Sequence, residues 1–385
     1  MKNTTTRLPG AAERIAASSR RPASLGTTAP GAISLAMGEP DAGTPSAIVD
    51  AAIQSLTAGR TRYSPMTGVP ELREAIARKI STEHARPTAP CEVVLTHGGS
   101  AGLAASMLAL IRPGDRVLIP EPTYSLYADQ AALVGAEVVW MANNPDGSLD
   151  LDAVRKEAPS ARMIMLCNPG NPTGRVYPAA DIHRVGTILA ANPDLLLLSD
   201  EAYGDIIFDG LEFVSALDLA GVSSQVIYCN TLSKSYAMTG WRLGYVVADG
   251  PLAEKINLIH RTINGPLNTF VQDAGFTALQ TTQTQLQAAA RSYRKRRDLV
   301  VERLGGLPEI SMFTPQGAFY AFPRITSQLS SDEMAARFVR AGVLVRSGSE
   351  FGPSGEGHIR ISFATDVSGL EEGLRRFVAT VRCFP

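Results

Sequence analysis

Four short segments hold side chains capable of chemistry, and an apolar run precedes each of them. They are the turn Gly98-Gly99-Ser100, the amide Asn171, the carboxylate Asp200 and the amine Lys234. In an open parallel sheet the carboxyl ends of the strands lie at one edge, and ligands bind beyond that edge. We therefore expect backbone N–H groups, an amide, a carboxylate and an amine to converge on a single site.

Two of these segments are suited to binding an anion and a cation. The glycines let the backbone approach an anion at the start of a helix, although a Gly-Gly pair is also a common tight turn. Asp200 lies two residues beyond a run of four leucines, residues 195–198. A carboxylate at the end of such a strand needs a partner, which a protonated ring nitrogen would supply; a helix N-cap is the alternative role.

Lys234 is the candidate nucleophile, with Thr231, Ser233 and Arg242 close to it in the sequence. A lysine near a fixed positive charge has a lowered pKa, which makes its amine available for attack. The hydroxyls and the guanidinium would suit a phosphate dianion. The alternative for a lysine considered alone is an exposed position in a Ser/Thr loop.

Arg360 is the candidate for binding a carboxylate. It lies in residues 358–364, where polar and apolar side chains alternate as in a strand with one polar face. A guanidinium binds a carboxylate through two parallel hydrogen bonds. A surface salt bridge is the alternative role for this arginine.

The elements that must position these groups are apolar runs separated by longer helical stretches. We expect strands at residues 93–95, 116–119, 137–140, 163–167, 195–198, 226–229 and 243–247, with helices at 101–110, 124–134 and 181–190. Runs without polar alternate positions are typical of strands covered on both faces. The pattern predicts an α/β domain with a mostly parallel, seven-stranded sheet between helices.

The chain of 385 residues is long enough for two domains. We expect residues 45–283 to form the large α/β domain. Residues 284–385, which mix strands near 319–322, 343–346 and 358–364 with helices at 331–341 and 370–381, are expected to form a smaller α+β domain. Residues 1–44 are predicted to be an N-terminal arm that contributes to the smaller domain.

Composition makes several functions improbable. A formal net charge of -1 provides no attraction to nucleic acid or to an anionic membrane, and no apolar stretch suggests a signal peptide or a membrane span. The four cysteines lack metal-ligand spacing, so we expect no metal site, and we expect a cytoplasmic location. The basic run at residues 294–297 is interpreted as a solvated helix face.

Taken together, the segments resemble fold-type I pyridoxal-phosphate enzymes, specifically the class I/II aminotransferases related to aspartate aminotransferase. The resemblance extends from Gly38 to the C-terminal helix. Its motifs are residues 63–73, 168–174, 199–203, 233–244, 317–320 and 359–362. The resemblance implies an enzyme of amino-acid metabolism or biosynthesis that moves an amino group between an L-amino acid and a 2-oxo acid by a ping-pong route.

The resemblance also implies how pyridoxal 5'-phosphate would be held. Lys234 corresponds to the lysine that forms a Schiff base with the cofactor and then carries a proton, and Asp200 to the carboxylate on the pyridine nitrogen. Asn171 and Tyr203 correspond to donors at the phenolic oxygen, and Tyr124 to the aromatic ring that stacks on the cofactor. The implied phosphate ligands are Gly99, Ser100, Ala101, Thr231, Ser233 and Arg242.

Substrate and partner follow from the same resemblance. Arg360 corresponds to the arginine that binds the substrate α-carboxylate, with Gly38 and Asn171 beside it. Tyr63 corresponds to a tyrosine that reaches the phosphate from the neighbouring subunit, which implies a homodimer with shared sites. No motif specifies the substrate side chain, so that preference stays open.

Two other functions remain as alternatives. The same cofactor chemistry serves other reactions, such as a cysteine-S-conjugate β-lyase or a biosynthetic cyclase or oxidase. Some transcription factors also use this fold as a cofactor-sensing module. About thirty residues precede Gly38, which is short for a DNA-binding domain, so we expect an enzyme.

Overall fold

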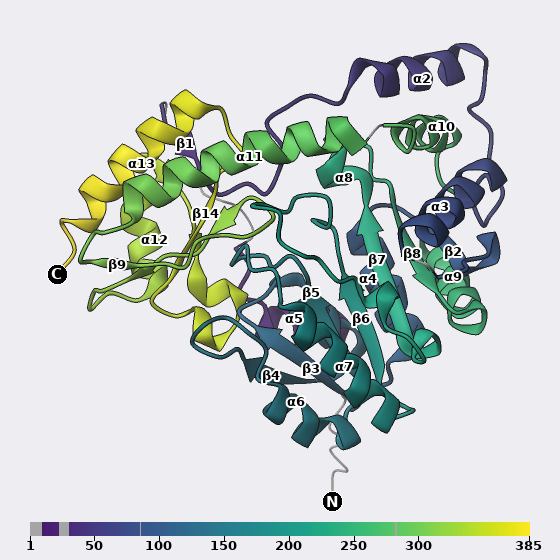
Figure 1. Ribbon diagram of the computed structural model, residues 1–385, viewed down its shortest axis with the longest axis horizontal. Helices are drawn as coiled ribbons and strands as arrows, with labels where there is room; N and C mark the ends of the chain where they lie inside the picture. Colours follow the sequence, from purple (N-terminus) through teal and green to yellow (C-terminus); the bar gives the residue numbers. More distant parts are fainter. Residues whose placement is uncertain (1–9, 23–30, 85, 282) are drawn as a thin grey trace, which may run out of the picture.

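A computed structural model describes residues 10–22, 31–84, 86–281 and 283–385, and its centre is a seven-stranded sheet (Figure 1). The strands are β2 (Val93–Thr96), β3 (Arg116–Glu121), β4 (Glu137–Ala142), β5 (Met163–Cys167), β6 (Leu196–Asp200), β7 (Val226–Thr231) and β8 (Gly244–Ala248). Their order is β2-β8-β7-β6-β5-β3-β4. β8 alone runs in the opposite direction to the other six strands of this sheet, so the predicted mostly parallel α/β architecture is confirmed.

Helices cover both faces of this sheet, which explains its continuous apolar runs. One face packs against α4 (Gly99–Leu110), α5 (Leu126–Val134) and α9 (Gly250–Asn264). The other packs against α3 (Pro70–Glu83), α6 (Leu151–Glu157), α7 (Ala179–Ala191) and α10 (Thr269–Ala278). Every residue of β5 and β6 is buried as a result.

The carboxyl ends of four parallel strands deliver the predicted chemical groups to one edge of the sheet. β2 ends at Thr96 before the glycine turn, β6 ends at Asp200, and β7 leads into the short helix α8 (Leu232–Ser235) that contains Lys234. β5 ends at Cys167, just before the segment that contains Asn171. The strand directions therefore bring together segments that are far apart in the sequence.

A second layer of structure covers that edge. It contains α11 (Gln283–Leu304), α12 (Ser331–Arg340), α13 (Val367–Val381) and the sheet β10-β14-β13, formed by Tyr320–Ala321, Ile359–Ser362 and Arg346–Ser347. Two further pairs are β9 (Ile310–Ser311) with β11 (Arg324–Ile325), and β1 (Ile33–Ser34) with β12 (Val343–Leu344). In Figure 1, α11 crosses above the large sheet towards α13 and the C-terminus.

The N-terminal segment joins both layers. β1 pairs with β12, and Leu35 packs in the same apolar cluster as the C-terminal helices, which supports the proposed assignment of this arm to the smaller domain. Earlier in the arm, α1 (Ala11–Ser18) packs on α5, where Arg14 donates hydrogen bonds to the carbonyls of Ala132 and Leu133 at 2.7 and 2.8 Å. α2 (Ser46–Thr57) then packs on α10. Among the described residues, no helix is both long and apolar enough to cross a membrane.

Candidate active site

Most of the predicted residues line one cavity of about 260 Å³ where the sheet edge meets the second layer. Two others, Ala101 and Tyr63, do not line it. Ala101 lies in the first turn of α4, and the Tyr63 side chain is 92% exposed on the surface. The predicted residues that line the cavity are Gly38, Gly99, Ser100, Tyr124, Asn171, Asp200, Tyr203, Thr231, Ser233, Lys234, Arg242 and Arg360.

Lys234 presents a buried amine to this cavity. Its Nζ donates a hydrogen bond of 2.6 Å to the Gly38 carbonyl and lies 5.9 and 5.8 Å from the ring centres of Tyr203 and Phe319. Burial, with a smaller contribution from the positive charge of Arg360, lowers the pKa of Lys234 to about 8. The lowered pKa was expected, but burial is its main cause, and Arg360 acts on it more strongly than the sequence neighbour Arg242.

Asp200 is a buried carboxylate without an ion-pair partner among the described side chains. Its Oδ2 accepts a hydrogen bond of 2.9 Å from the Tyr127 hydroxyl, and its Oδ1 accepts one of 3.2 Å from the Ala202 amide. A turn rather than a helix follows it, so the carboxylate caps no helix. Burial raises the pKa of Asp200, and a cationic nitrogen in the cavity would offset that cost.

An anion cradle lies at the end of the cavity formed by α4 and β7. Gly98 has a φ of +79°, and a Cβ at this position would lie 2.5 Å from Nη2 of Arg242. Arg242 itself adopts a left-handed φ of +55°, a conformation that costs a residue with a side chain of order 1 kcal/mol. Glycine thus lets the guanidinium approach the N-terminus of α4, where free N–H groups favour an anion.

The hydroxyls on the opposite side of this cradle belong to the turn before Lys234. Thr231 caps α8 by accepting a hydrogen bond of 3.2 Å from the Ser233 amide, and the two hydroxyls are 2.8 Å apart. Both residues line the cavity together with Gly99, Ser100 and Arg242. This set of donors matches the needs of a phosphate group.

Arg360 lies at the other end of the cavity, fully buried and incompletely hydrogen bonded. Its guanidinium lies between the rings of Tyr320 and Phe351, at 4.6 and 5.0 Å from their centres. Nη1 donates to Oδ1 of Asn171 at 3.0 Å and Nη2 to the Ala36 carbonyl at 2.5 Å, whereas the buried Nε has no partner in the described part of the chain. A bound carboxylate would satisfy that donor and neutralise the charge.

Tyr203 and Tyr320 form the wall between the two ends. Their hydroxyls are 2.8 Å apart, and a Cβ on Gly38 would lie 2.0 Å from the Tyr320 hydroxyl. The backbone at Gly38 can therefore lie against both Tyr320 and Lys234 only because this residue is glycine. Tyr124 lines the cavity opposite, with its ring edge-on to Tyr127 at 5.6 Å.

Several residues of the site had no role predicted from the sequence. Tyr127 of α5 lies behind the cavity wall and contacts Asp200, and most of the unpredicted residues that line the cavity come from the N-terminal arm, the end of β5 or the second layer. Tyr320 was within a recognised motif, but nothing in the sequence relates the arm and residues 346–351 to the sheet edge. Those without a predicted role include Arg21, Ala36, Met37, Cys167, Tyr320, Arg346 and Phe351.

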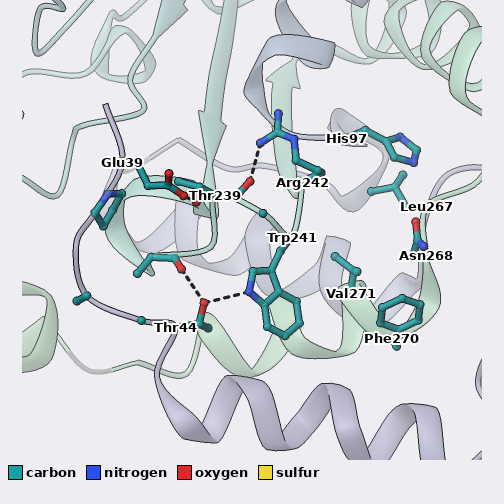
Figure 2. A pocket seen from close by; sticks show the side chains of 15 residues that line it. Glu39, Thr44, His97, Thr239, Trp241, Arg242, Leu267, Asn268, Phe270 and Val271 are labelled. Atoms are coloured by element: carbon teal, nitrogen blue, oxygen red, sulfur yellow. Dashed lines mark hydrogen bonds between the residues drawn. The ribbon is translucent and has the colours of Figure 1, made fainter. Parts of the chain in front are cut away.

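A second cavity of about 620 Å³ lies beside the first and shares Arg242 with it (Figure 2). Its walls include Trp241, Phe270 and Val271, and the Trp241 indole donates a hydrogen bond of 3.0 Å to the Thr44 hydroxyl. Figure 2 shows the Arg242 guanidinium directed away from Trp241, Val271 and Phe270, and it donates a hydrogen bond of 2.9 Å to the Thr239 carbonyl. Arg242 is thus a wall residue of both cavities.

Comparison with known proteins matches this geometry to an enzyme class. The model of the family described as aminotransferase class I and II matches residues 30–377. Aspartate aminotransferase of Pyrococcus horikoshii is 34% identical, covering 89% of this chain and 89% of that protein. Arginine–pyruvate transaminase AruH of Pseudomonas aeruginosa is 36% identical, covering 89% of this chain and 88% of that protein. The solved structure of an aromatic aminotransferase from Pyrococcus horikoshii has a TM-score of 0.89 at 32% identity, covering 97% of this chain and 99% of that one.

The fold and the site thus define a pyridoxal-phosphate-dependent transferase. The chain belongs to the class I and II aminotransferase family, as the resemblance of its motifs predicted. It is an aminotransferase that acts on amino acids and 2-oxo acids, and the alternative reactions on the same fold are not favoured. The residues present fit the cofactor, because a buried carboxylate without a counter-ion, a buried amine and a glycine cradle line one cavity.

Proposed function

We propose that this aminotransferase works through Lys234 as the residue that binds the cofactor and moves the proton, with Arg360 as the residue that binds the substrate α-carboxylate. The observation that carries the proposal is the placement of both cations in one cavity of about 260 Å³ whose wall includes the carboxylate of Asp200. Such a cavity offers an amine, an anion subsite and a counter-ion for a cationic ring to one small molecule.

Each residue has a definite task in this proposal. Arg242, Thr231, Ser233 and the N-terminus of α4 hold the phosphate, and Asp200 keeps a proton on the pyridine nitrogen. When bound, pyridoxal phosphate supplies an electron sink that stabilises negative charge at the substrate Cα. Nζ of Lys234 accepts the proton that leaves this Cα. Because its pKa is lowered to about 8, roughly a tenth of the amine is uncharged at pH 7, far more than for an ordinary lysine, and can act as a base.

Two remaining residues orient the reactants. Asn171 accepts a hydrogen bond from Arg360 and so fixes the plane of the guanidinium that receives the carboxylate. Tyr203, held by the Tyr320 hydroxyl, would donate to the phenolic oxygen of the cofactor together with Asn171. The Tyr124 ring, which lines the cavity, would cover the cofactor face.

We also propose a homodimer with shared sites in the cytoplasm. The second cavity reaches Arg242 from outside the subunit and has an apolar wall, which suits a side chain of another chain. Three exposed apolar residues lie within ten positions of Tyr63 in the sequence, namely Ile53 and Leu56 of α2 and Met66. Tyr63 of the partner subunit would enter this second cavity and reach the phosphate.

The test combines two measurements: the visible absorption band of the bound cofactor and the analysis of reaction products. We expect Lys234→Ala to lose the visible band of the bound cofactor and all activity, because no other described lysine lines the cavity. Borohydride should fix the cofactor to the peptide containing residue 234 in the wild-type protein. Lys255→Ala on the exposed side of α9 is the matched control and should behave as wild type.

The same protein should then be incubated with single amino acids, with and without a 2-oxo acid. Stoichiometric conversion of the bound cofactor without ammonia supports transamination, with turnover only when the acceptor is added. Release of pyruvate and ammonia without an acceptor would instead indicate a lyase and refute the proposed route.

A further inference from the structure

The cavity contains a second arginine beside the proposed carboxylate-binding residue. Arg346 of β13 lies directly opposite Arg360 of β14 in the antiparallel register, and both side chains line the cavity. Directly opposed residues have Cβ atoms about 5 Å apart, and like charges at such positions destabilise a sheet. Two adjacent guanidiniums in one cavity therefore require anions near both.

The chain supplies an anion for Arg346 alone. Glu350 accepts hydrogen bonds from both Nε and Nη2 of Arg346 on a single oxygen, Oε2, and the Nε bond is 2.8 Å. The two side chains are 16% and 6% exposed, so the pair is held firmly. Nη1 of Arg346 has no hydrogen-bond partner among the described residues. Nη1 is thus the nitrogen of this guanidinium that is left for a ligand, and Arg346 lines the cavity.

Most of the charged side chains that line the cavity already have a proposed role. Its wall contains five basic side chains, Arg21, Lys234, Arg242, Arg346 and Arg360, and one carboxylate, Asp200. The cofactor and the substrate α-carboxylate account for Asp200, Lys234, Arg242 and Arg360. Arg346 and Arg21 are left, and among the described residues Arg21 forms one long ion pair, of 3.7 Å, with Asp129.

We propose that Arg346, held in place by Glu350, is a specificity-determining residue that binds a second carboxylate of the substrate, with Arg21 of the arm adding positive charge at the mouth of the cavity. The inference rests on the proposed function of the site. It names a dicarboxylic amino acid, or the corresponding dicarboxylic 2-oxo acid, as the substrate class. A site built for a second carboxylate rejects an isosteric amide, because the guanidinium would remain without its anion.

The first experiment measures binding without chemistry. Glutarate and its monoamide have nearly the same shape and differ by one charge, and both can be titrated into the holoenzyme by calorimetry. We expect glutarate to bind about tenfold or more tightly than the monoamide. Arg346→Met should reduce that ratio to near one, whereas Arg340→Met on the exposed side of α12 should leave it unchanged.

A second variant separates specificity from folding. Arg346→Met leaves Glu350 buried and unpaired, which can destabilise the protein. The double variant Arg346→Met/Glu350→Gln removes both charges, and it should lose the same preference while it retains the cofactor band. If glutarate and its monoamide bind equally to the wild-type protein, or if the variants weaken both ligands by the same factor, the proposal is wrong.

A third measurement distinguishes failure of the dicarboxylate proposal from failure of the proposed function. Cofactor conversion is followed with L-glutamate against L-glutamine and with L-aspartate against L-asparagine. Faster conversion by the acids, lost in the Arg346 variants, supports the assignment. Conversion by both members of each pair at equal rates would overturn the dicarboxylate assignment and leave transamination intact. Absence of conversion by any amino acid, with glutarate still preferred, would overturn the proposed function alone.

Discussion

Two buried cations in one cavity influence each other at the scale of single residues. Lys234 and Arg360 both have neutral hydrogen-bond partners, namely the Gly38 carbonyl for the amine and the Asn171 and Ala36 oxygens for the guanidinium. Burial lowers the pKa of each group, and the charge of Arg360 further lowers that of Lys234. The arginine would thus prepare the amine as well as bind the substrate.

This coupling predicts a pH dependence for cofactor capture by the apoenzyme. The amine must be uncharged to react, so the capture rate should rise with pH and level off above the lysine pKa of about 8, far below its ordinary value of 10.5. Stopped-flow absorbance at the band of the bound cofactor measures this capture rate. Arg360→Gln removes a charge that lowers the pKa of Lys234 and should move the midpoint upward. A midpoint near 10.5 in the wild-type protein would contradict the prediction.

At the scale of elements, the end of β6 sends adjacent carboxylates to opposite sides of the sheet. Asp200 faces the cavity, whereas Oε1 of Glu201 accepts hydrogen bonds of 2.8 Å from the Ser199 hydroxyl and the Ala216 amide. Burial raises the pKa of Glu201 from 4.5 to about 7. The sequence placed both residues at a strand end but provided no sign of these separate roles.

Glu201 should therefore make folding stability depend on pH. Its folded-state pKa is raised, so its contribution is fully present below pH 4.5 and is lost as the pH rises through about 7. We expect Glu201→Gln to keep the two hydrogen bonds and to remove this loss, which corresponds to roughly 3 kcal/mol. Thermal unfolding of both proteins between pH 4.5 and 8 measures the difference. Parallel curves would show that Glu201 has the same pKa in the folded and unfolded states.

α11 provides the clearest difference between expectation and structure among the helices. The basic run at residues 294–297 was interpreted as a solvated face, and that interpretation is wrong for two of its residues. Arg296 and Arg297 are buried, and they form ion pairs of 2.7 and 2.8 Å with Asp41 and Asp209. A charge run alone does not reveal acidic partners that are 255 and 88 residues away.

At the scale of the whole molecule, the proposed homodimer would complete the site with a residue of a second chain. Tyr63 is exposed in a single subunit and does not line the cavity, whereas the resemblance of its motif assigns it to the phosphate. A shared site explains both facts, because a C2 dimer places the same residue in the partner's cavity. Light scattering should give twice the chain mass of 40.9 kDa.

Mixed dimers provide the sharper prediction. Lys234→Ala subunits and Tyr63→Ala subunits can be co-expressed with different tags. If each site uses Lys234 of one chain and Tyr63 of the other, a mixed dimer contains one intact site. Random pairing makes about half of the dimers mixed, so about a quarter of wild-type activity should return. Each variant alone should be impaired. If purified mixed dimers regain nothing, each site uses Tyr63 of its own chain or does not use it.

The amino-acid sequence by itself determined the α/β class, the seven-stranded sheet and most of the cavity wall. Local patterns carry this information: apolar runs such as residues 195–198 mark buried strands, and the residues just after them must lie at the sheet edge. Lys234, Asp200 and the glycine turn could be located for this reason, and the family motifs added Arg360, which comes from another layer.

Only the tertiary structure decided how these groups act on one another. Burial sets the pKa of Lys234, and the register of β13 with β14 places Arg346 beside Arg360. Both effects depend on through-space distance and exclusion of water, which contacts between remote segments create. Lys234 and Arg360 are 126 positions apart in the chain, and no local pattern reports the charge that one exerts on the other.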